Sequence, residues 1–336
     1  MTVVGPFGLS VRDQALEADV RAGMAAVEEG LLEATKSEVP FITEAAQHLV
    51  RAGGKRFRPL LVMLAARFGD PDAPGIVPSA VVVELTHLAT LYHDDVMDEA
   101  AVRRGVPSAN TRWANSVAVL TGDFLFARAS RILADLGPEA VRVQAQAFER
   151  LVAGQILETA GPQDGRDPVD HYLDVLGGKT GSLVAVSCRF GAMLSGARES
   201  VVDVLTQYGE RLGVAFQLAD DVLDIASDSR ESGKTPGTDL REGIPTLPVL
   251  RLRERASRLG LPEDRELCEL LDADLGDDAR LAEAVRLLRA HPALLQARRD
   301  TVRYAEEARA ALTPLPECEA KTALVDLCDA VVHRAG

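Results

Sequence analysis

Apolar residues recur at spacings of three and four along almost the whole chain of 336 residues, which is the pattern of amphipathic helices. Alternating β-branched segments between turn dipeptides are essentially missing from the sequence. Aromatic residues make up only 4% of the chain, so its core has to be filled by Leu, Val and Ala. The sequence therefore predicts an all-α protein.

The predicted helices are separated by short segments that carry Gly and Pro. The strongest periodic segments cover residues 9–36, 41–52, 60–68, 76–97, 109–136, 138–159, 180–194 and 199–225. Several shorter ones follow from residue 246 to the end. No repeat with a period of roughly 20–50 residues and no low-complexity linker divides the sequence, which favours one domain over residues 1–336 with about a dozen helices.

Charge, hydropathy and cysteine content exclude several classes of protein. The chain has 51 acidic and 37 basic residues, a net charge of −14, and such a surface repels nucleic-acid phosphates. No apolar run approaches the ~18 residues of a membrane span, and the first residues lack a signal-peptide pattern. The four cysteines form no C-x-x-C pair, which predicts reduced core thiols without disulfides or zinc. We expect a soluble cytoplasmic protein with no nucleic-acid partner and no stable membrane insertion.

Two aspartate clusters, each after an apolar helical segment, carry the main chemical signal. They consist of Asp94, Asp95 and Asp98, and of Asp220, Asp221 and Asp224. Residues four apart share a helix face with Cβ atoms about 5–6 Å apart, so Asp94 and Asp98 repel unless a cation lies between them. Hard oxygen ligands favour Mg²⁺, which keeps positions for water and substrate phosphate. One cluster alone is more simply a solvated helix end, but two suggest a diphosphate held by several metal ions.

Two groups of basic residues could hold an anionic ligand, one well before the first cluster in the sequence and one directly after it. The stretch GGKRFRP holds Lys55, Arg56 and Arg58, and Arg103 and Arg104 follow the cluster. Arg binds phosphate through paired hydrogen bonds and Lys binds it as a point charge. In an acidic chain such local groups favour a small anionic ligand, although each residue alone could be solvated surface charge.

Five motifs, in this order, resemble the trans-isoprenyl diphosphate synthase (polyprenyl synthetase) family. They read GGKRFRP, HLATLYHDDVMDEAAVRRG, GGKTG, FQLADDVLD and GKTPGTDLREG. The resemblance implies the isoprenoid synthase fold, a bundle around a deep central cavity with the two aspartate clusters across its mouth, usually as a homodimer. It also implies a Mg²⁺-dependent, all-trans polyprenyl diphosphate synthase. Such an enzyme condenses isopentenyl diphosphate with an allylic diphosphate, farnesyl or geranylgeranyl, and releases diphosphate.

The resemblance assigns roles to individual residues. The residues implied to be catalytic are Asp94, Asp98, Lys179, Gln217 and Asp220. The aspartates Asp94, Asp98 and Asp220 would bind up to three Mg²⁺ ions, which Mn²⁺ could replace, with Asp221 and Asp224 in support. Isopentenyl diphosphate would contact Lys55, Arg58, His87 and Arg104, and the allylic diphosphate would contact Arg103, Lys179, Thr180, Gln217 and Lys234. Many relatives have a second Lys at the position of Ile244, so this chain has one fewer positive charge there.

Small residues before the first cluster bear on product length. In the family, synthases of short products place a bulky aromatic residue four or five positions before the first aspartate. Those positions are Thr90 and Ala89 here, and Thr86 one turn further is also small. With a rise of 1.5 Å per residue, Ala89 lies about 7.5 Å along the helix from Asp94, which favours a product of roughly six to ten isoprene units. The alternatives are a C15 or C20 product, a floor set deeper in the cavity, and small residues that only let a neighbouring helix pack closely.

Other functions fit the sequence less well. Glu84 and His87 form the E-x-x-H element of a di-iron bundle, but no second such element is present. The two G-K-T tripeptides, at residues 178–180 and 233–235, lack the earlier Gly of a P-loop. A terpene cyclase would not be expected to carry GGKRFRP, and a non-catalytic synthase subunit would typically have lost its aspartates. The chain is therefore predicted to be a prenyltransferase.

Overall fold

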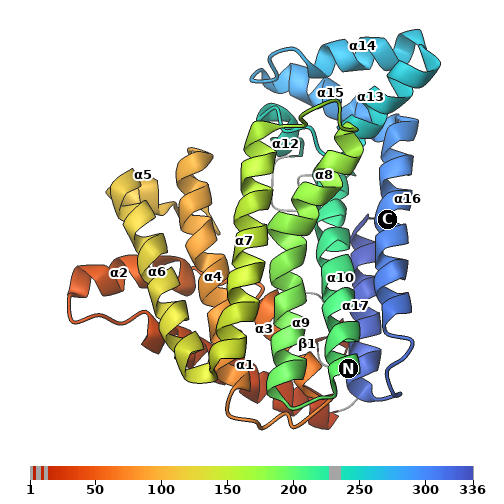
Figure 1. Cartoon of the computed structure of the whole chain (residues 1–336). Coiled ribbons are helices and arrows are strands. Elements are labelled where there is room, and N and C mark those ends of the chain that lie inside the picture. The colour runs from red at the N-terminus through yellow and green to blue at the C-terminus, as the bar shows by residue number, and fades with distance from the viewer. Residues whose placement is uncertain (1–2, 5–8, 11–13, 227–235, 336) are drawn as a thin grey trace. The chain divides into compact units, whose positions relative to one another are not determined.

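Helices make up nearly all of the described structure (Figure 1). The computed structural model describes residues 3–4, 9–10, 14–226 and 236–335, so Lys234 lies outside the described residues. Contacts divide the chain into two compact units. Unit 1 comprises residues 1–149, 183–209 and 311–326, and unit 2 comprises residues 150–182, 210–310 and 327–336.

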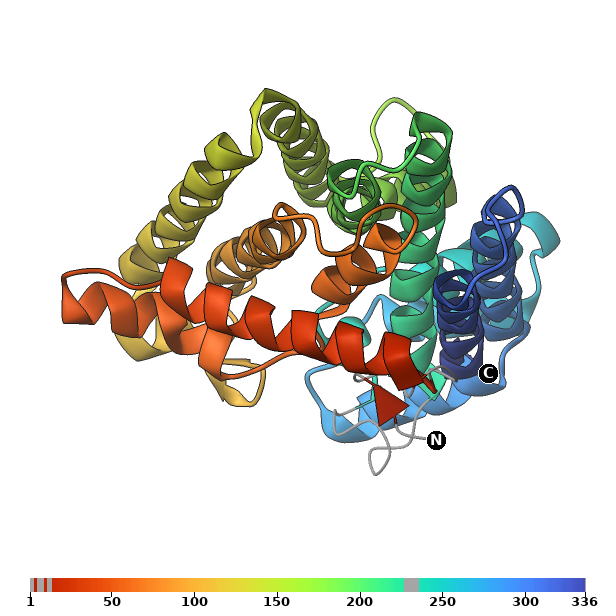
Figure 2. The ribbon, with the colours of Figure 1, turned by 90° about the horizontal axis from the view of Figure 1, so that it is seen from below.

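Unit 1 is built mainly from the first half of the chain. Its helices are α1 (Gln14–Ala34), α2 (Pro40–Arg51), α3 (Phe57–Ala66), α4 (Ile76–Met97), α5 (Ala109–Trp113), α6 (Asn115–Leu136) and the start of α7 (Pro138–Ala160). Most of α9 (Ser182–Leu194) and the first parts of α10 (Glu199–Ala226) and α17 (Glu319–Ala335) complete it. Helix α4 packs against α1, α3 and α6, and Figure 2 shows α1 in red running across one side of α3 and α4.

Helix α4 is the central helix of unit 1 because it is apolar on nearly every side. The fully buried Tyr92 ties it to α2, since the Tyr92 hydroxyl donates a hydrogen bond of 2.6 Å to a backbone carbonyl of that helix. One stripe differs, because His87, Thr90, Leu91 and Asp94 are half-exposed. These positions share one helix face at spacings of three and four, so the stripe marks open space along a helix that is otherwise packed.

Unit 2 holds the remaining helices. They are the second half of α7, α8 (Pro168–Leu176), the π-helical turn η1 (Gly177–Gly181), the second half of α10, α12 (Thr238–Arg241), α13 (Leu247–Leu259), α14 (Pro262–Leu271), α15 (Asp278–Ala290), α16 (Pro292–Ala311) and the end of α17. Helix α7 and η1 meet backbone to backbone. A Cβ atom on Gly154 would lie 2.6 Å from the amide nitrogen of Lys179, and one on Gly178 would lie 2.9 Å from the carbonyl of Arg150. Only glycine fits at these two crossing points.

The prediction of an all-α protein is confirmed, with few boundary differences. Helix α4 has the predicted bounds, 76–97. The helix predicted from residue 9 begins at Gln14, because β2 (Leu9–Ser10) pairs with β1 (Val3–Val4). The segment predicted as one helix over 109–136 breaks at Ala114, whose φ of 114° is incompatible with a helix.

The composition of the core also matches the prediction. Leu, Val and Ala dominate the buried side chains, joined by a few aromatic residues such as Phe190 and Tyr208. Cys188 and Cys328 are buried as expected. The prediction of core thiols is wrong for Cys318, which is exposed near the start of α17. Across the described ranges, no helix combines the length and apolar character needed to cross a membrane.

Candidate active site

The first aspartate cluster lies at the carboxyl end of α4, where its three carboxylates differ in environment. Asp95 is buried and pairs with Arg103 Nε at 2.5 Å. Burial raises the pKa of Asp95, which the hydrogen bond from Arg103 partly offsets. Asp94 stays half-exposed and the Asp98 side chain is 55% exposed. The cluster therefore presents Asp94 and Asp98, one turn apart, while Asp95 anchors the segment that follows.

That segment is a short hairpin of β3 (Val102–Arg103) and β4 (Val106–Pro107), with Arg104 at its turn. Arg104 has a left-handed backbone with φ 54°. Its guanidinium donates hydrogen bonds to the carbonyls of Leu49, at 3.1 Å, and Gly53. A Cβ atom on Gly54 would lie 2.7 Å from the guanidinium carbon, so the glycine at this position makes the space that Arg104 occupies.

Unit 1 contains three residues predicted to bind isopentenyl diphosphate, namely Arg58, His87 and Arg104. The charge of Arg104 lowers the pKa of Arg58, and the charges of both arginines lower the pKa of His87. Burial lowers the pKa of Arg58 to about 10, with Arg104 adding to the effect and Glu84 opposing it. Arg58 therefore stays charged at neutral pH. Its Nε atom is buried and has no hydrogen-bond partner among the described residues. Lys55 is exposed in the loop before α3.

His87 supplies a neutral group beside these cations. Desolvation, and then the charges of Arg58 and Arg104, hold the pKa of His87 well below its usual value. A neutral imidazole can donate one N–H to a phosphate oxygen without adding charge. The arrangement of two guanidinium groups and a neutral donor suits an anion with several oxygen atoms.

Arg56 has a different role from the one its sequence position suggests. Its side chain is only 6% exposed and binds Glu28 at 2.5 Å and Glu84 at 2.9 Å. Another hydrogen bond of 2.9 Å reaches the carbonyl of Val50. Arg56 thus ties α1, α2 and α4 together, and its charge is already compensated by protein carboxylates.

The second cluster lies on the part of α10 in unit 2, and each carboxylate has its own partner. Asp220 binds Arg334 of α17 at 2.7 Å. Asp221 is buried and accepts a hydrogen bond from the hydroxyl of Tyr172, and burial raises the pKa of Asp221 to about 8. Asp224 accepts backbone N–H groups at the start of α12, at 3.2 and 3.3 Å. A protonated Asp221 is a poor metal ligand, which agrees with a supporting role.

These partners explain why no three acidic, His or Cys side chains converge as a metal site within the described ranges. Asp95, Asp221 and Asp224 point at protein groups. Asp98 is exposed, and Asp94, Asp220 and Asp224 each keep part of their surface exposed. All of their donors are carboxylate oxygens, which are the ligands of hard divalent cations. The residues therefore fit the implied Mg²⁺ in chemistry.

The residues predicted to hold the allylic diphosphate are placed as follows. Lys179 and Thr180 lie in η1, where Lys179 Nζ binds Glu158 of α7 at 2.6 Å. Gln217 of α10 donates a weak hydrogen bond of 3.4 Å to Asp221. Arg103 pairs with Asp95, as described above. Ile244 is 42% exposed in unit 2.

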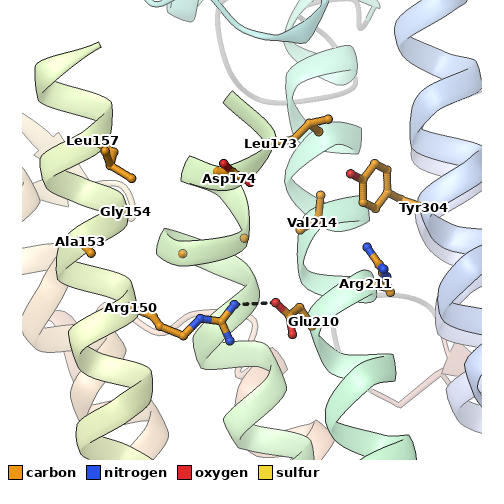
Figure 3. Close-up of a pocket in the computed structure, with 12 residues that line it drawn as sticks. Arg150, Ala153, Gly154, Leu157, Leu173, Asp174, Glu210, Arg211, Val214 and Tyr304 are labelled. Atoms are coloured by element: carbon orange, nitrogen blue, oxygen red, sulfur yellow. Dashed lines mark hydrogen bonds and ion pairs between the residues drawn. The ribbon is translucent and has the colours of Figure 1, made fainter. Parts of the chain in front are cut away.

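Two cavities outside these groups hold none of the predicted site residues. Figure 3 shows one in unit 2, about 300 Å³ in volume, with Leu157, Leu173 and Val214 among the side chains around it. Its Arg150 is paired with Glu210 at 2.5 Å, so the charges around it compensate each other. The other, about 650 Å³, lies in unit 1 and is lined by Glu44, His48, Arg51, Ala52, Val106, Pro107 and Arg112. In this cavity Arg112 is already paired with Glu44 at 2.5 Å, and Arg51 donates a hydrogen bond of 2.7 Å to Gln47.

Several partner residues carry no local sequence signal. Glu158, Tyr172 and Arg334 each contact a predicted site residue from a segment far away in the sequence. Glu84 is the exception, because it is the single charged residue in the apolar run 76–93. A lone carboxylate in such a run must be compensated by a cation elsewhere.

Comparison with known proteins now decides the family. Residues 39–288, most of the chain, match the sequence family described as Polyprenyl synthetase. The chain belongs to the polyprenyl synthetase family. It is 47% identical over 331 residues to nonaprenyl diphosphate synthase of Mycobacterium tuberculosis, covering 98% of this chain and 97% of that one. It is 40% identical to dimethylallyltranstransferase of the same organism, covering 96% of this chain and 97% of the relative.

A solved structure agrees with this assignment. The crystal structure of geranylgeranyl pyrophosphate synthase from Corynebacterium glutamicum, complexed with calcium and isoprenyl diphosphate, superposes with a TM-score of 0.86. The two chains are 44% identical, and the match covers 96% of this chain and 98% of that one. The isoprenoid synthase fold predicted from the motifs is therefore confirmed. In that crystal structure the relative is complexed with a divalent metal ion, calcium.

We expect Gly54→Ala to weaken binding of isopentenyl diphosphate about tenfold or more, because the new methyl group displaces the Arg104 guanidinium and one charge-assisted contact is lost. Gly53→Ala is the matched control. Both glycines have positive φ, but nothing lies within 4 Å of a Cβ on Gly53. Titration calorimetry measures the effect, and equal losses in the two variants would contradict this assignment of Arg104.

The depressed pKa of His87 predicts a specific pH dependence of stability. Below about pH 6.5 the unfolded chain takes up a proton at His87 while the folded chain does not, so protonation favours unfolding. The free energy of unfolding should therefore fall between pH 7 and pH 5, and it should fall less in His87→Gln. Urea denaturation at several pH values measures both curves, and parallel curves would argue against a neutral His87.

Proposed function

We propose that this chain is an all-trans polyprenyl diphosphate synthase, a prenyltransferase that adds isopentenyl diphosphate to an allylic diphosphate in successive 1′-4 condensations. The observation that carries the proposal is the group formed by Arg58, His87 and Arg104, in the same unit as the exposed carboxylates of Asp94 and Asp98. Cations for an anionic substrate and carboxylates for a divalent metal are the two requirements of diphosphate chemistry. Membership of the polyprenyl synthetase family supports the reading.

In this mechanism, Arg58 and Arg104 hold the diphosphate of isopentenyl diphosphate through charge-assisted hydrogen bonds, and neutral His87 adds an N–H donor. Asp94, Asp98 and Asp220 would hold Mg²⁺, which Mn²⁺ could replace. When bound, the metal neutralises charge on the leaving diphosphate as a Lewis acid. Lys179, Thr180 and Gln217 orient the allylic diphosphate, with Arg103 and Lys234 as further contacts.

The carbon chemistry needs protection from water more than it needs a catalytic base. The half-exposed stripe of α4 presents Leu91 and Thr90 between Asp94 and His87. An apolar wall next to the allylic centre keeps water from trapping the cation as an alcohol. The released diphosphate can accept the proton that the new carbon chain loses, so no dedicated side-chain base is required.

The reaction itself tests this proposal. We expect purified chain, given isopentenyl diphosphate, farnesyl diphosphate and Mg²⁺, to release diphosphate and form longer prenyl diphosphates, and a chelator to abolish turnover. Asp94→Ala and Asp220→Ala should each lower kcat about 10²–10³-fold or more, because each removes a ligand where charge develops. Asp277→Ala, which removes an exposed carboxylate that only caps α15, is the control. Near-normal turnover in both active-site variants would refute the metal assignment.

We further propose a product of roughly six to ten isoprene units, with an open position near the first aspartate as the cause. The structure distinguishes the two small residues, because Thr90 lies on the half-exposed stripe whereas Ala89 is fully buried. Thr90→Phe should therefore shorten the product with little loss of stability. Ala89→Phe overpacks the core and should cost about 1–3 kcal/mol of unfolding free energy. Chromatography of dephosphorylated products decides, and mainly C15 or C20 alcohols from the wild type would favour the short-chain alternative.

A homodimer is also part of the proposal, supported by apolar side chains on the surface of unit 1. Leu120 of α6 is 66% exposed, and Val119 and Val141 are 39% and 42% exposed. We expect light scattering to give twice the chain mass of 35.9 kDa, and Leu120→Asp to shift the protein toward monomer. Leu259→Asp, at a residue of unit 2 that is 46% exposed, is the control. A monomeric wild type at micromolar concentration, or a requirement for a second kind of chain, would refute the homodimer.

Two further expectations belong to the same proposal. The sequence has no C-x-x-C pair, which favours a reducing, cytoplasmic location. The single domain over residues 1–336 is supported by the family match, which extends across most of the chain. Limited proteolysis that releases a stable fragment would contradict the single domain.

A further inference from the structure

Glu84 is a buried carboxylate that the proposed reaction does not use. It lies within the apolar run of α4, and its side chain is only 2% exposed. Burying an isolated carboxylate costs several kcal/mol unless cations and hydrogen bonds compensate it. The residues that compensate the charge of Glu84 therefore indicate its role.

Those partners are two arginines from different segments. Arg56 Nη1 lies 2.9 Å from Glu84 Oε1, and Arg104 Nη2 lies 3.7 Å from the same oxygen. Arg56 is held on its other side by Glu28 and by the carbonyl of Val50. It cannot turn toward a ligand without breaking these bonds, so it provides a fixed cation against which Glu84 is anchored.

Arg104 differs from Arg56 in what its guanidinium can still do. Its side chain keeps 16% of its surface exposed, and it donates hydrogen bonds through Nη1 to the carbonyls of Leu49 and Gly53. Glu84 approaches from the Nη2 side. The guanidinium is therefore held by two carbonyls at Nη1 and attracted by the Glu84 carboxylate at Nη2, which fixes its orientation.

The charge of Glu84 also affects a third arginine, Arg58. Burial lowers the pKa of Arg58 most, the charge of Arg104 lowers it further, and the charge of Glu84 offsets part of this lowering. Three guanidinium groups gathered without a carboxylate would repel one another and turn toward solvent. With Glu84 among them, the three guanidinium groups can stay close together before an anion binds. Such preorganisation raises the affinity for the anion.

We propose that Glu84 is a positioning residue for the isopentenyl diphosphate site, where it holds Arg104 against Arg56 and keeps Arg58 and Arg104 together in the absence of ligand. The inference rests on the proposed function, because it takes that diphosphate as the anion received by Arg58 and Arg104. Glu84 itself does not touch the substrate. The E-x-x-H pattern of Glu84 and His87 is explained in this way, with one residue orienting the cations and the other donating beside them.

The sign of the effect separates positioning from simple charge. If Glu84 only reduced the local positive potential, Glu84→Gln would strengthen anion binding. If it positions Arg104, the same substitution weakens binding even though the site becomes more positive. Glutamine keeps the shape of the side chain, so the two explanations predict opposite results.

The decisive experiment titrates isopentenyl diphosphate into metal-free protein by calorimetry, with no allylic substrate present. We expect Glu84→Gln to raise Kd about tenfold or more, since an oriented charge-assisted contact is lost. Glu28→Gln is the matched control, because it removes the other carboxylate partner of Arg56 and does not contact Arg104. Its Kd should stay within about twofold of the wild type.

Steady-state kinetics provide the second readout. Glu84→Gln should raise KM for isopentenyl diphosphate by a similar factor and leave KM for the allylic diphosphate unchanged, whereas a general loss of structure moves both. If Glu84→Gln does not fold, Glu84→Asp keeps the charge one methylene further back and should give a smaller rise. Unchanged or tighter binding, or equal rises for both substrates, overturns the inference. A wild type without prenyltransferase activity overturns the proposed function instead.

Discussion

The ion pair between Arg56 and Glu84 is the constraint on which unit 1 depends. The Arg56 guanidinium binds the Glu28 carboxylate of α1, the Val50 carbonyl in the last turn of α2 and the Glu84 carboxylate in the middle of α4. Arg56 itself directly precedes α3. Removing either partner of a buried pair leaves a charge without compensation, which typically costs about 3–5 kcal/mol. The pair therefore links the packing of four helices to the position of the residues that carry the anion site.

The two aspartate clusters share a sequence pattern, but their carboxylates have different partners. In each, the residue next to the first aspartate turns inward, Asp95 to Arg103 and Asp221 to Tyr172. Asp224 is used to begin α12, whereas Asp98, at the corresponding position of the first cluster, remains exposed. Identical letters in D-D-x-x-D thus stand for carboxylates with different surroundings, buried at Asp95 and Asp221 and at least partly exposed at the other four positions.

Local patterns predicted what depends on local physics. The 3.6-residue periodicity predicted α4 to its last residue. What could not be predicted are contacts made over long sequence distances, such as Arg334 with Asp220 or Tyr172 with Asp221, because nothing near either residue encodes its partner. The contacts of Arg56 could not be predicted for the same reason. Its neighbours in GGKRFRP indicate a phosphate ligand, and only the fold shows that two glutamates from α1 and α4 already occupy it.

The backbone contact between α7 and η1 limits how this protein can diverge. Because Gly154 and Gly178 leave no room for a Cβ atom, neither position can accept another residue unless the two segments move apart. Such a movement would also carry away Lys179, whose amide lies at the crossing and whose side chain binds Glu158. The crossing itself is therefore expected to stay unchanged over evolutionary time.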